Sequence, residues 1–163
     1  MSNNLDDPRF TAFGLFAEAY AGLTARFAAQ FEEHRLSAVE FEVLLRLARS
    51  PGRRLRMTDL AGQTSLSTSG VTRVVDRMDR DGLVRREACA SDRRSSYAVI
   101  TDDGMARLAE AVPGHLALVQ KWFIGQLTPE QLTGLLESLR KIRDAVNPCA
   151  TAGSDEPAPA EAA

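Results

Sequence analysis

The stretch between Leu66 and Thr101 limits the fold more tightly than any other part of this chain. A helical run follows Ser67 and ends at Gly82, and its residues divide between two sides of the helix. One side carries Val71, Val74, Val75 and Met78, the other carries Ser69, Thr72, Arg73, Asp76 and Arg80, and Arg77 lies on the flank. Two strand-like runs over 83–88 and 95–100 follow at once, separated by a charged turn of six residues. A helix and a hairpin that share one core are therefore predicted.

Three helices are predicted on the N-terminal side of this unit. Apolar residues recur every three or four positions over 10–31, which indicates a long amphipathic helix rich in aromatic rings. The second helix begins after Ser37, with Glu40 at capping-box spacing, and stops at the Pro51–Gly52 pair. A short third helix runs from about Thr58 to Thr64, with Thr58 as its cap.

The C-terminal part predicts two further helices and a tail. Thr101 caps the first of these helices, and Pro113 inside it is expected to kink the helix or to split it. Thr128 caps the second helix, whose apolar stripe runs over 132–142. Alanine, proline, serine and acidic residues dominate the last part of the chain, so 147–163 are predicted to be a disordered tail.

The order of these elements defines the expected fold class. It is mainly α with a small β-hairpin wing, which is the layout of a winged helix-turn-helix flanked by long helices. We expect one domain over 1–146, with the winged lobe at 36–100 and flanking helices at 8–35 and 101–146.

Charge is distributed unevenly along the chain. The 163 residues carry a net charge of −2, yet residues 53–101 hold ten arginines against six acidic residues. A positive patch on an acidic body steers a polyanion to one face. No apolar run reaches the roughly 18 residues of a membrane span, and the first residues lack a signal-peptide pattern. A bacterial-type cytoplasmic protein without membrane contact is therefore expected.

Cysteine and histidine residues give no sign of a metal, a cofactor or catalysis. The two cysteines and two histidines show neither CxxC nor HxxxH spacing, so neither a zinc site nor a disulfide framework is expected. The run STSGV lacks the first glycine of a G-x-S-x-G motif, and both histidines fall on unrelated helices. An enzyme is therefore not expected.

The polar side of the helix after Ser67 suits the major groove of DNA. Small hydroxyl side chains at its start let the backbone approach bases and phosphates, and the free N–H groups there favour an anion. Arg73, one turn further on, has the reach to donate two hydrogen bonds to a guanine. The alternative is an ordinary solvated helix face.

The charged turn of the hairpin suits the minor groove. The run ASDRRS puts Arg93 and Arg94 at a projecting tip, with Arg85 and Arg86 on the strand that leads to it. A projecting arginine fits the negative potential of narrow A·T tracts. Asp92 is expected to pair with a neighbouring arginine and so to fix the tip. The alternative is a charged turn without a function.

Residues 36–101 resemble the MarR (multiple antibiotic resistance regulator) family of bacterial transcription factors. The resemblance rests on the runs LSAVEFEVLLRLARSP, MTDLAGQTSLSTSGVTRVVDRMDRDGLVRR and DRRSSYAVITDDG. The last run matches the wing signature of that family, a D-x-R pattern that ends in an apolar residue and threonine before a helix. Ile100 stands where leucine is more usual.

The resemblance implies specific roles for the residues of both motifs. Five residues of the recognition helix are expected in the major groove: Ser67, Thr68, Ser69, Thr72 and Arg73. Arg77 is expected near the DNA backbone, and Arg93 and Arg94 at the wing tip. The first and the last two helices are expected to form a homodimer, so that two wings read a pseudo-palindrome in double-stranded DNA. Independently, these helices offer more apolar surface than one small winged domain covers.

The same resemblance raises the question of an effector. Family members often release DNA when a small molecule, often phenolic, enters beside the dimer helices. Phe13, Phe16, Tyr20 and Phe41 are the candidates to line such a cleft, and the alternative is that these rings are plain core. Residues 8–35 contain no cysteine, which disfavours oxidant sensing of the kind known in some relatives. A winged helix that docks a protein instead of DNA is the alternative function.

Overall fold

The computed structural model describes residues 6–64, 66–89, 92–148 and 150, and for residues 92–94 it describes the backbone alone. Its elements follow the chain in this order: α1 (Pro8–Glu33), α2 (Ala38–Ala48), a 3-10 turn (Pro51–Arg53), β1 (Arg54–Arg56), α3 (Met57–Thr64), α4 (Thr68–Arg80), β2 (Val84–Cys89), β3 (Asp92–Ile100), α5 (Asp102–Trp122), a 3-10 turn (Ile124–Gln126) and α6 (Pro129–Val146). The predicted fold class, mainly α with a small winged sheet, is confirmed. Most of the predicted tail lies outside the described residues.

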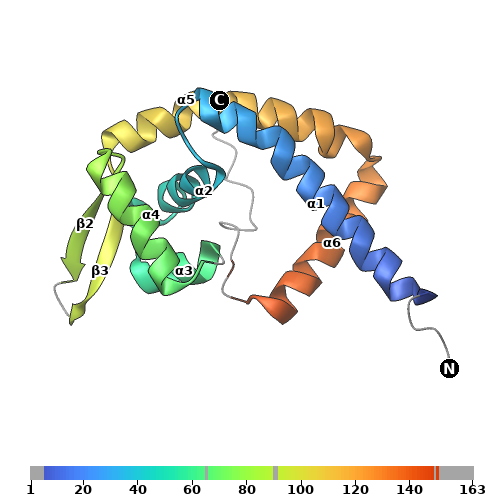
Figure 1. Cartoon of the computed structure of the whole chain (residues 1–163), viewed down its shortest axis with the longest axis horizontal. Helices are drawn as coiled ribbons and strands as arrows, with labels where there is room; N and C mark the ends of the chain where they lie inside the picture. Colours follow the sequence, from blue (N-terminus) through green and yellow to red (C-terminus); the bar gives the residue numbers. More distant parts are fainter. Residues whose placement is uncertain (1–5, 65, 90–91, 149, 151–163) are drawn as a thin grey trace, which may run out of the picture.

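The molecule has a compact lobe of short helices and strands at one end and long helices that extend away from it. Figure 1 shows α2, α3, α4 and the β2–β3 hairpin gathered together, while α1 and α5 run side by side toward the other end. The α6 helix folds back from that end and lies away from the hairpin (Figure 1). Among the described residues, no helix is both long and apolar enough to cross a bilayer.

The core of the lobe is built from the side of α4 that the sequence predicted. Val71, Val75 and Met78 are fully buried, and Val74 is partly buried against the same cluster. They pack with side chains from α2, α3 and the sheet, among them Leu44 and Leu60. On the opposite side of α4, Ser69, Arg73, Asp76 and Arg80 are exposed.

Most helices begin at the capping residues that the sequence predicted. Ser37 and Glu40 form a reciprocal capping box on α2, and Thr128 does the same with Gln131 on α6. Thr101 caps α5 through the amide of Gly104. The expected cap at Thr58 is wrong, because α3 already begins at Met57, directly after β1.

Pro113 does not split α5, which runs unbroken from Asp102 to Trp122. A proline inside a helix removes one backbone hydrogen bond and disturbs the preceding turn. Here α1 supports that turn, because the Nε2 of Gln30 donates a hydrogen bond of 3.0 Å to the carbonyl of Ala111. Of the expected kink or split, the split is therefore wrong, because the loss of one hydrogen bond does not outweigh the packing of the buried Leu108 and Ala111 against α1 and α2.

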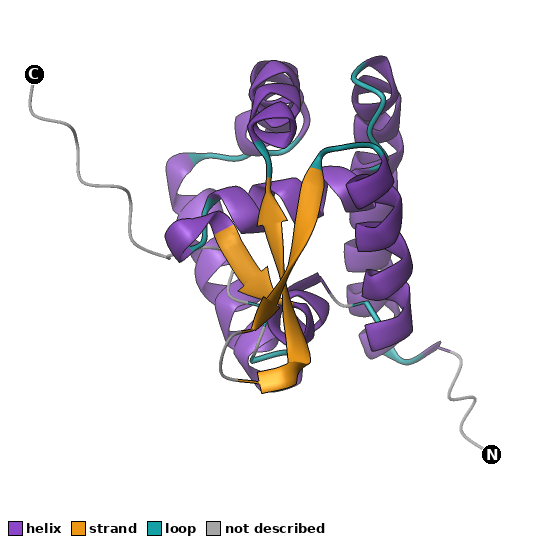
Figure 2. Cartoon of the chain, turned by 90° about the vertical axis from the view of Figure 1, so that its left-hand side faces the viewer, coloured by secondary structure: helices purple, strands orange, loops and turns teal. Residues whose placement is uncertain are grey.

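The sheet has three strands rather than the two predicted. Its order is β1-β3-β2, and all pairs are antiparallel, with Leu55 opposite Ala98 and Val84 opposite Ile100 (Figure 2). The turn is also shorter than expected, because Cys89 already pairs with Asp92. Residues 93 and 94 therefore belong to a strand, immediately after the turn rather than within it.

Candidate nucleic-acid interface

The start of α4 presents hydroxyl groups to solvent. Ser67 caps the helix, and its Oγ accepts a hydrogen bond of 3.0 Å from the amide of Gly70. The Oγ of Ser69 lies 3.2 Å from that of Ser67, and both residues are exposed, as is Thr68. This end of the helix thus offers free amides and small donors without bulky side chains, which suits close approach to an anionic backbone.

The Nε of Arg80 on α4 donates a hydrogen bond of 3.3 Å to the carbonyl of Asp76, whereas Arg73 has no such contact within the described residues. It is exposed, and within the described residues its guanidinium has neither a hydrogen bond nor an ion pair. Thr72 beside it is half-buried. Asp76 on the next turn is used within the protein, because its Oδ1 lies 3.1 Å from the Nη2 of Arg86 on β2. This ion pair ties the recognition helix to the hairpin.

Arg77 forms an ion pair that sequence reasoning missed. Its Nε donates to the Oε1 of Glu40 on α2 at 2.7 Å, while about half of its side chain stays exposed. Burial alone would raise the pKa of the Glu40 carboxyl, but hydrogen bonds from the Ser37 amide and from Arg77 outweigh burial and hold that pKa below its usual value. Glu40 therefore stays ionised and anchors α4 to the start of α2.

A small groove separates α4 from the hairpin. Its volume is about 210 Å³. It is lined by Met57, Thr58, Thr68, Thr72, Arg86, Ser95 and Ser96. Five of these residues were not predicted as site residues: Met57, Thr58, Arg86, Ser95 and Ser96. The strand register explains Arg86, because it lies opposite the fully buried Ala98 and therefore shares the sheet face that meets α4.

The predicted wing-tip residues occupy the first positions of β3. The backbone places Asp92, Arg93 and Arg94 directly after the turn, and their side chains lie outside the described part of the chain. The predicted ion pair between Asp92 and an arginine therefore lies outside the described residues.

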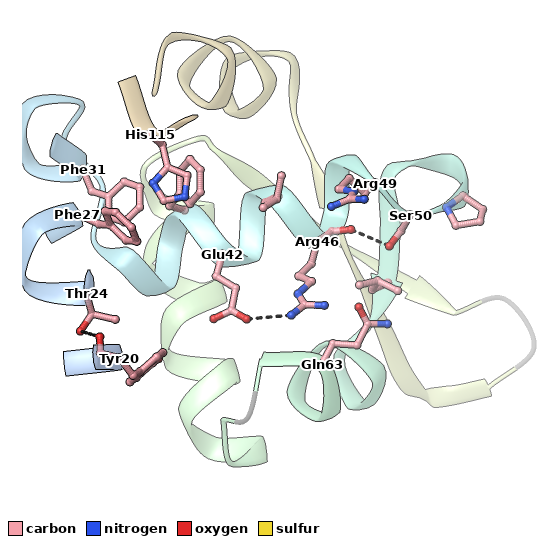
Figure 3. A pocket seen from close by; sticks show the side chains of 14 residues that line it. Tyr20, Thr24, Phe27, Phe31, Glu42, Arg46, Arg49, Ser50, Gln63 and His115 are labelled. Atoms are coloured by element: carbon pink, nitrogen blue, oxygen red, sulfur yellow. Dashed lines mark hydrogen bonds and ion pairs between the residues drawn. The ribbon is translucent and has the colours of Figure 1, made fainter. Parts of the chain in front are cut away.

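A second cavity lies between α1, α2 and α5 (Figure 3). Its volume is about 520 Å³. Its lining includes Tyr20, Thr24, Phe27, Phe31, Phe41, Glu42, Leu45, Arg46, Arg49 and His115. Two of the four residues predicted for a cleft, Tyr20 and Phe41, are therefore brought together here. Phe13 and Phe16 are not, because they lie on a solvent-facing side of α1 with 72% and 53% of their surface exposed.

His115 forms one wall of this cavity. Its ring lies 4.8–5.0 Å from the rings of Phe27, Phe31 and Phe41, measured between centroids. Burial lowers the pKa of His115, so its imidazole is neutral at neutral pH. Its Nδ1 is buried and has no hydrogen-bond partner within the described residues. Arg46 lies across the cavity, with its Nη2 3.3 Å from the Oε1 of Glu42.

Metal-binding side chains do not gather in the part of the chain that the structure describes: no group of three or more suitable residues is found there.

A helix with a free polar side, tied to a hairpin and carried on a three-helix lobe, defines a winged helix-turn-helix protein. The sequence model of the MarR family matches residues 36–95. The uncharacterized HTH-type transcriptional regulator YkoM of Bacillus subtilis (strain 168) is 30% identical over 130 residues, which are 79% of this chain and 82% of YkoM. This chain belongs to the MarR family, and it is a DNA-binding transcriptional regulator rather than an enzyme.

Two solved structures extend the comparison. Sco3205, a MarR family transcriptional regulator from Streptomyces coelicolor solved in complex with DNA, is 33% identical with a TM-score of 0.80, over 88% of this chain and 90% of that one. BpsR of Bordetella bronchiseptica, whose DNA binding is regulated by 6-hydroxynicotinic acid, is 27% identical with a TM-score of 0.73, over 82% of this chain and 99% of that one.

Proposed function

We propose that the protein is a homodimeric repressor that binds a pseudo-palindromic operator in double-stranded DNA and is released by a small-molecule effector. The observation that carries the proposal is the free polar side of α4, where Arg73 is unpaired within the described residues while its neighbours Asp76 and Arg77 are held in ion pairs. Sco3205, which has the same fold, is known in complex with DNA, which supports the DNA-binding part. Such a regulator acts on chromosomal DNA and so in the bacterial cytoplasm.

Each residue predicted for the DNA interface has a part in this proposal. Ser67, Thr68, Ser69, Thr72 and Arg73 enter the major groove. Arg77 approaches the DNA backbone with the exposed edge of its guanidinium, while Glu40 holds its Nε. Arg93 and Arg94 reach the minor groove, and Asp92 orders the turn that carries them.

Exposed apolar side chains support the homodimer. Phe10, Phe13, Leu15, Phe16 and Tyr20 on α1 and Ile142 and Val146 on α6 are all more than half exposed. Exposed large apolar side chains in such number on two helices favour a protein–protein interface. We therefore assign 8–35 and 101–146 to dimerisation and 36–100 to DNA binding. Light scattering at micromolar concentration should give twice the chain mass of 17.8 kDa, and a monomer mass would contradict the assignment.

The cavity beside His115 supports the effector. Its walls are largely aromatic, and the buried Nδ1 of His115 lacks a partner that a ligand group would supply. BpsR shows that a small aromatic molecule regulates a protein of this fold. We propose a small aromatic or phenolic effector in this cavity, next to α2 and therefore one helix away from α4.

Two variants test the DNA-binding roles. Arg73→Ala should weaken operator binding by about 1–3 kcal/mol and relax preference at one base pair per half-site, because it removes a base contact. Arg94→Ala should weaken many sequences alike and lower the salt slope by about one unit per protomer, because Arg94 meets phosphate and the minor-groove potential rather than a base edge. Titrations against operator and scrambled duplex at several salt concentrations distinguish the two. If neither variant changes binding to any DNA, the protein-docking alternative replaces this proposal.

A further inference from the structure

The wing sheet has an outer face that no predicted function uses. Its inner face carries Leu55, Ala98 and Ile100 and packs on the core. Because side chains alternate along a strand, the neighbours of these residues point outward. The strand register brings together Arg54, Arg56, Arg85, Glu87, Tyr97 and Val99, which we call the outer wing face. In Figure 2 the strands lie in front of the helices, and no described helix covers this face.

Two arginines of this face are held by one aromatic ring. The Cζ of Arg54 lies 4.8 Å from the centroid of the Tyr97 ring, and that of Arg56 lies 5.8 Å from it. The Nε of Arg56 also donates a hydrogen bond of 3.3 Å to the Tyr97 hydroxyl. Stacking on a ring orders a guanidinium but leaves most of its N–H edge open for phosphate oxygens.

Positive charge remains in excess on the outer wing face. Glu87 is its single acid, and Arg54 and Arg85 share it, at 3.8 Å and 2.7 Å. Arg56 forms no ion pair within the described residues, although the Asp59 carboxylate on α3 acts on it electrostatically. Val99 in the middle of this face is only 5% exposed although it points outward, so the arginine stems also cover apolar surface. Three arginines against one acid make this an ordered cationic surface.

The position of α4 on bound DNA determines which stretch of the duplex the outer wing face would contact. The α4 helix lies on the inner side of the sheet and is tied to it by the Arg86–Asp76 ion pair. If α4 occupies the major groove and the hairpin turn enters the next minor groove, as proposed above, the outer wing face is turned away from the half-site. It then faces the stretch of duplex that lies beyond the operator.

We propose that the outer wing face binds the phosphate backbone of DNA flanking the operator, with Arg54 and Arg56 as the contacting residues. This inference rests on the proposed DNA-binding function. Charge complementarity selects DNA as the occupant, and the face lies on the same hairpin as the proposed wing contact. The two wings of a dimer would add such contacts at both ends of the site.

Duplex length provides the test. The operator is first located by footprinting on the promoter region of the protein's own gene. Two duplexes are then compared, one that ends at the wing contact and one with about 10 further base pairs of scrambled sequence on each side. Four additional arginine contacts per dimer should steepen the salt slope on the long duplex by about three to four units, and long-duplex affinity at about 0.1 M salt should be at least tenfold higher.

Three variants separate the possible outcomes. Arg54→Ala combined with Arg56→Ala should abolish the preference for the long duplex and leave affinity for the short duplex within about twofold of wild type. A matched control, Arg53→Ala, removes an exposed charge of the same lobe that lies outside the outer wing face and should leave the preference intact. Arg54→Lys combined with Arg56→Lys should retain part of the preference for the long duplex, because lysine keeps the positive charge but does not stack on Tyr97.

Several results would overturn the inference. One is a wild-type protein that binds both duplexes with equal affinity and equal salt slope. Another is an alanine double variant that weakens both duplexes alike and also lowers the thermal midpoint, since that indicates a structural role. If the wild type binds the short duplex, the proposed DNA-binding function stands even when this inference fails. If the wild type binds no duplex, both fail together.

Discussion

Replacing Glu40 by alanine should destabilise the DNA-binding lobe through three lost hydrogen bonds. The carboxylate accepts from the amide and the hydroxyl of Ser37, both at 2.8 Å, and from the Nε of Arg77 at 2.7 Å. Only 8% of Glu40 is exposed, so water does not replace these partners freely. The substitution therefore opens the capping box of α2 and releases α4 from α2 in one step.

The magnitude follows from the kind of bond lost. A hydrogen bond to a charged group contributes about 1.5–3 kcal/mol, and loss of a helix cap costs about 1 kcal/mol. The lower part of that range applies to Arg77, because its guanidinium is half exposed and regains water. Ser37 keeps its own hydrogen bond with the amide of residue 40. We expect a total of about 2–3 kcal/mol, which for a chain of this size lowers the thermal midpoint by about 4–10 °C.

The pH dependence gives a second, independent expectation. Because the folded-state pKa of Glu40 lies below its usual value, the contribution of Glu40 is fully present above the unfolded-state pKa of about 4.3. It is lost as the pH falls through the folded-state pKa. The difference in stability between wild type and Glu40→Ala should thus be constant near pH 6–7 and shrink below about pH 4.3.

Thermal unfolding followed by circular dichroism measures both effects. Glu42→Ala is the matched control, because Glu42 lies on the same helix but forms a more exposed pair with Arg46. That pair should contribute about 0.5 kcal/mol or less. Equal midpoints for the Glu40 and Glu42 variants at pH 7, or a difference from wild type that does not shrink in acid, would refute the reasoning.

Three further variants test other parts of the structure. Gly104→Ala should destabilise by about 3 kcal/mol or more in denaturant titrations, because a Cβ there would lie 2.1 Å from the backbone carbonyl oxygen of Leu83; a normal unfolding midpoint would contradict this close approach. Phe13→Ser combined with Phe16→Ser should shift light scattering from dimer to monomer at micromolar concentration, and an unchanged mass would place the interface elsewhere. Cys89→Ser should leave DNA binding and its response to peroxide unchanged, and a peroxide response that the Ser variant lacks would make Cys89 a redox switch.

Local patterns predicted most of the helices because their causes are local. The 3.6-residue spacing of Val71, Val75 and Met78 sets one side of α4 whatever surrounds it, and all three are buried. Capping boxes such as Ser37 with Glu40 connect residues three apart, so their spacing is visible in the sequence. The hairpin was predicted for the same reason, since its strands are neighbours along the chain.

Features that depend on distant partners could not be predicted in this way. A strand as short as β1 has no alternation to detect, and only pairing with β3, more than forty residues later, makes it a strand. The hydrogen bond from Gln30 of α1 to the carbonyl of Ala111, in the turn before Pro113, joins residues 81 positions apart. The cavity wall at His115 likewise needs rings from α1 and α2, which a lone histidine in the sequence does not indicate.

Arginine pairing shows why a count of charges does not locate a binding surface. Residues 53–101 hold ten arginines, but Arg77 and Arg86 are tied to acids on other elements and Arg85 to Glu87 on its own strand. These ion pairs hold the helix and the hairpin at fixed positions. Arg73 has no such partner within the described residues, so its N–H groups stay free for a base edge. The arginines that shape the lobe and the arginine proposed to read DNA are thus different residues, and replacing Arg73 should alter sequence preference while leaving the fold intact.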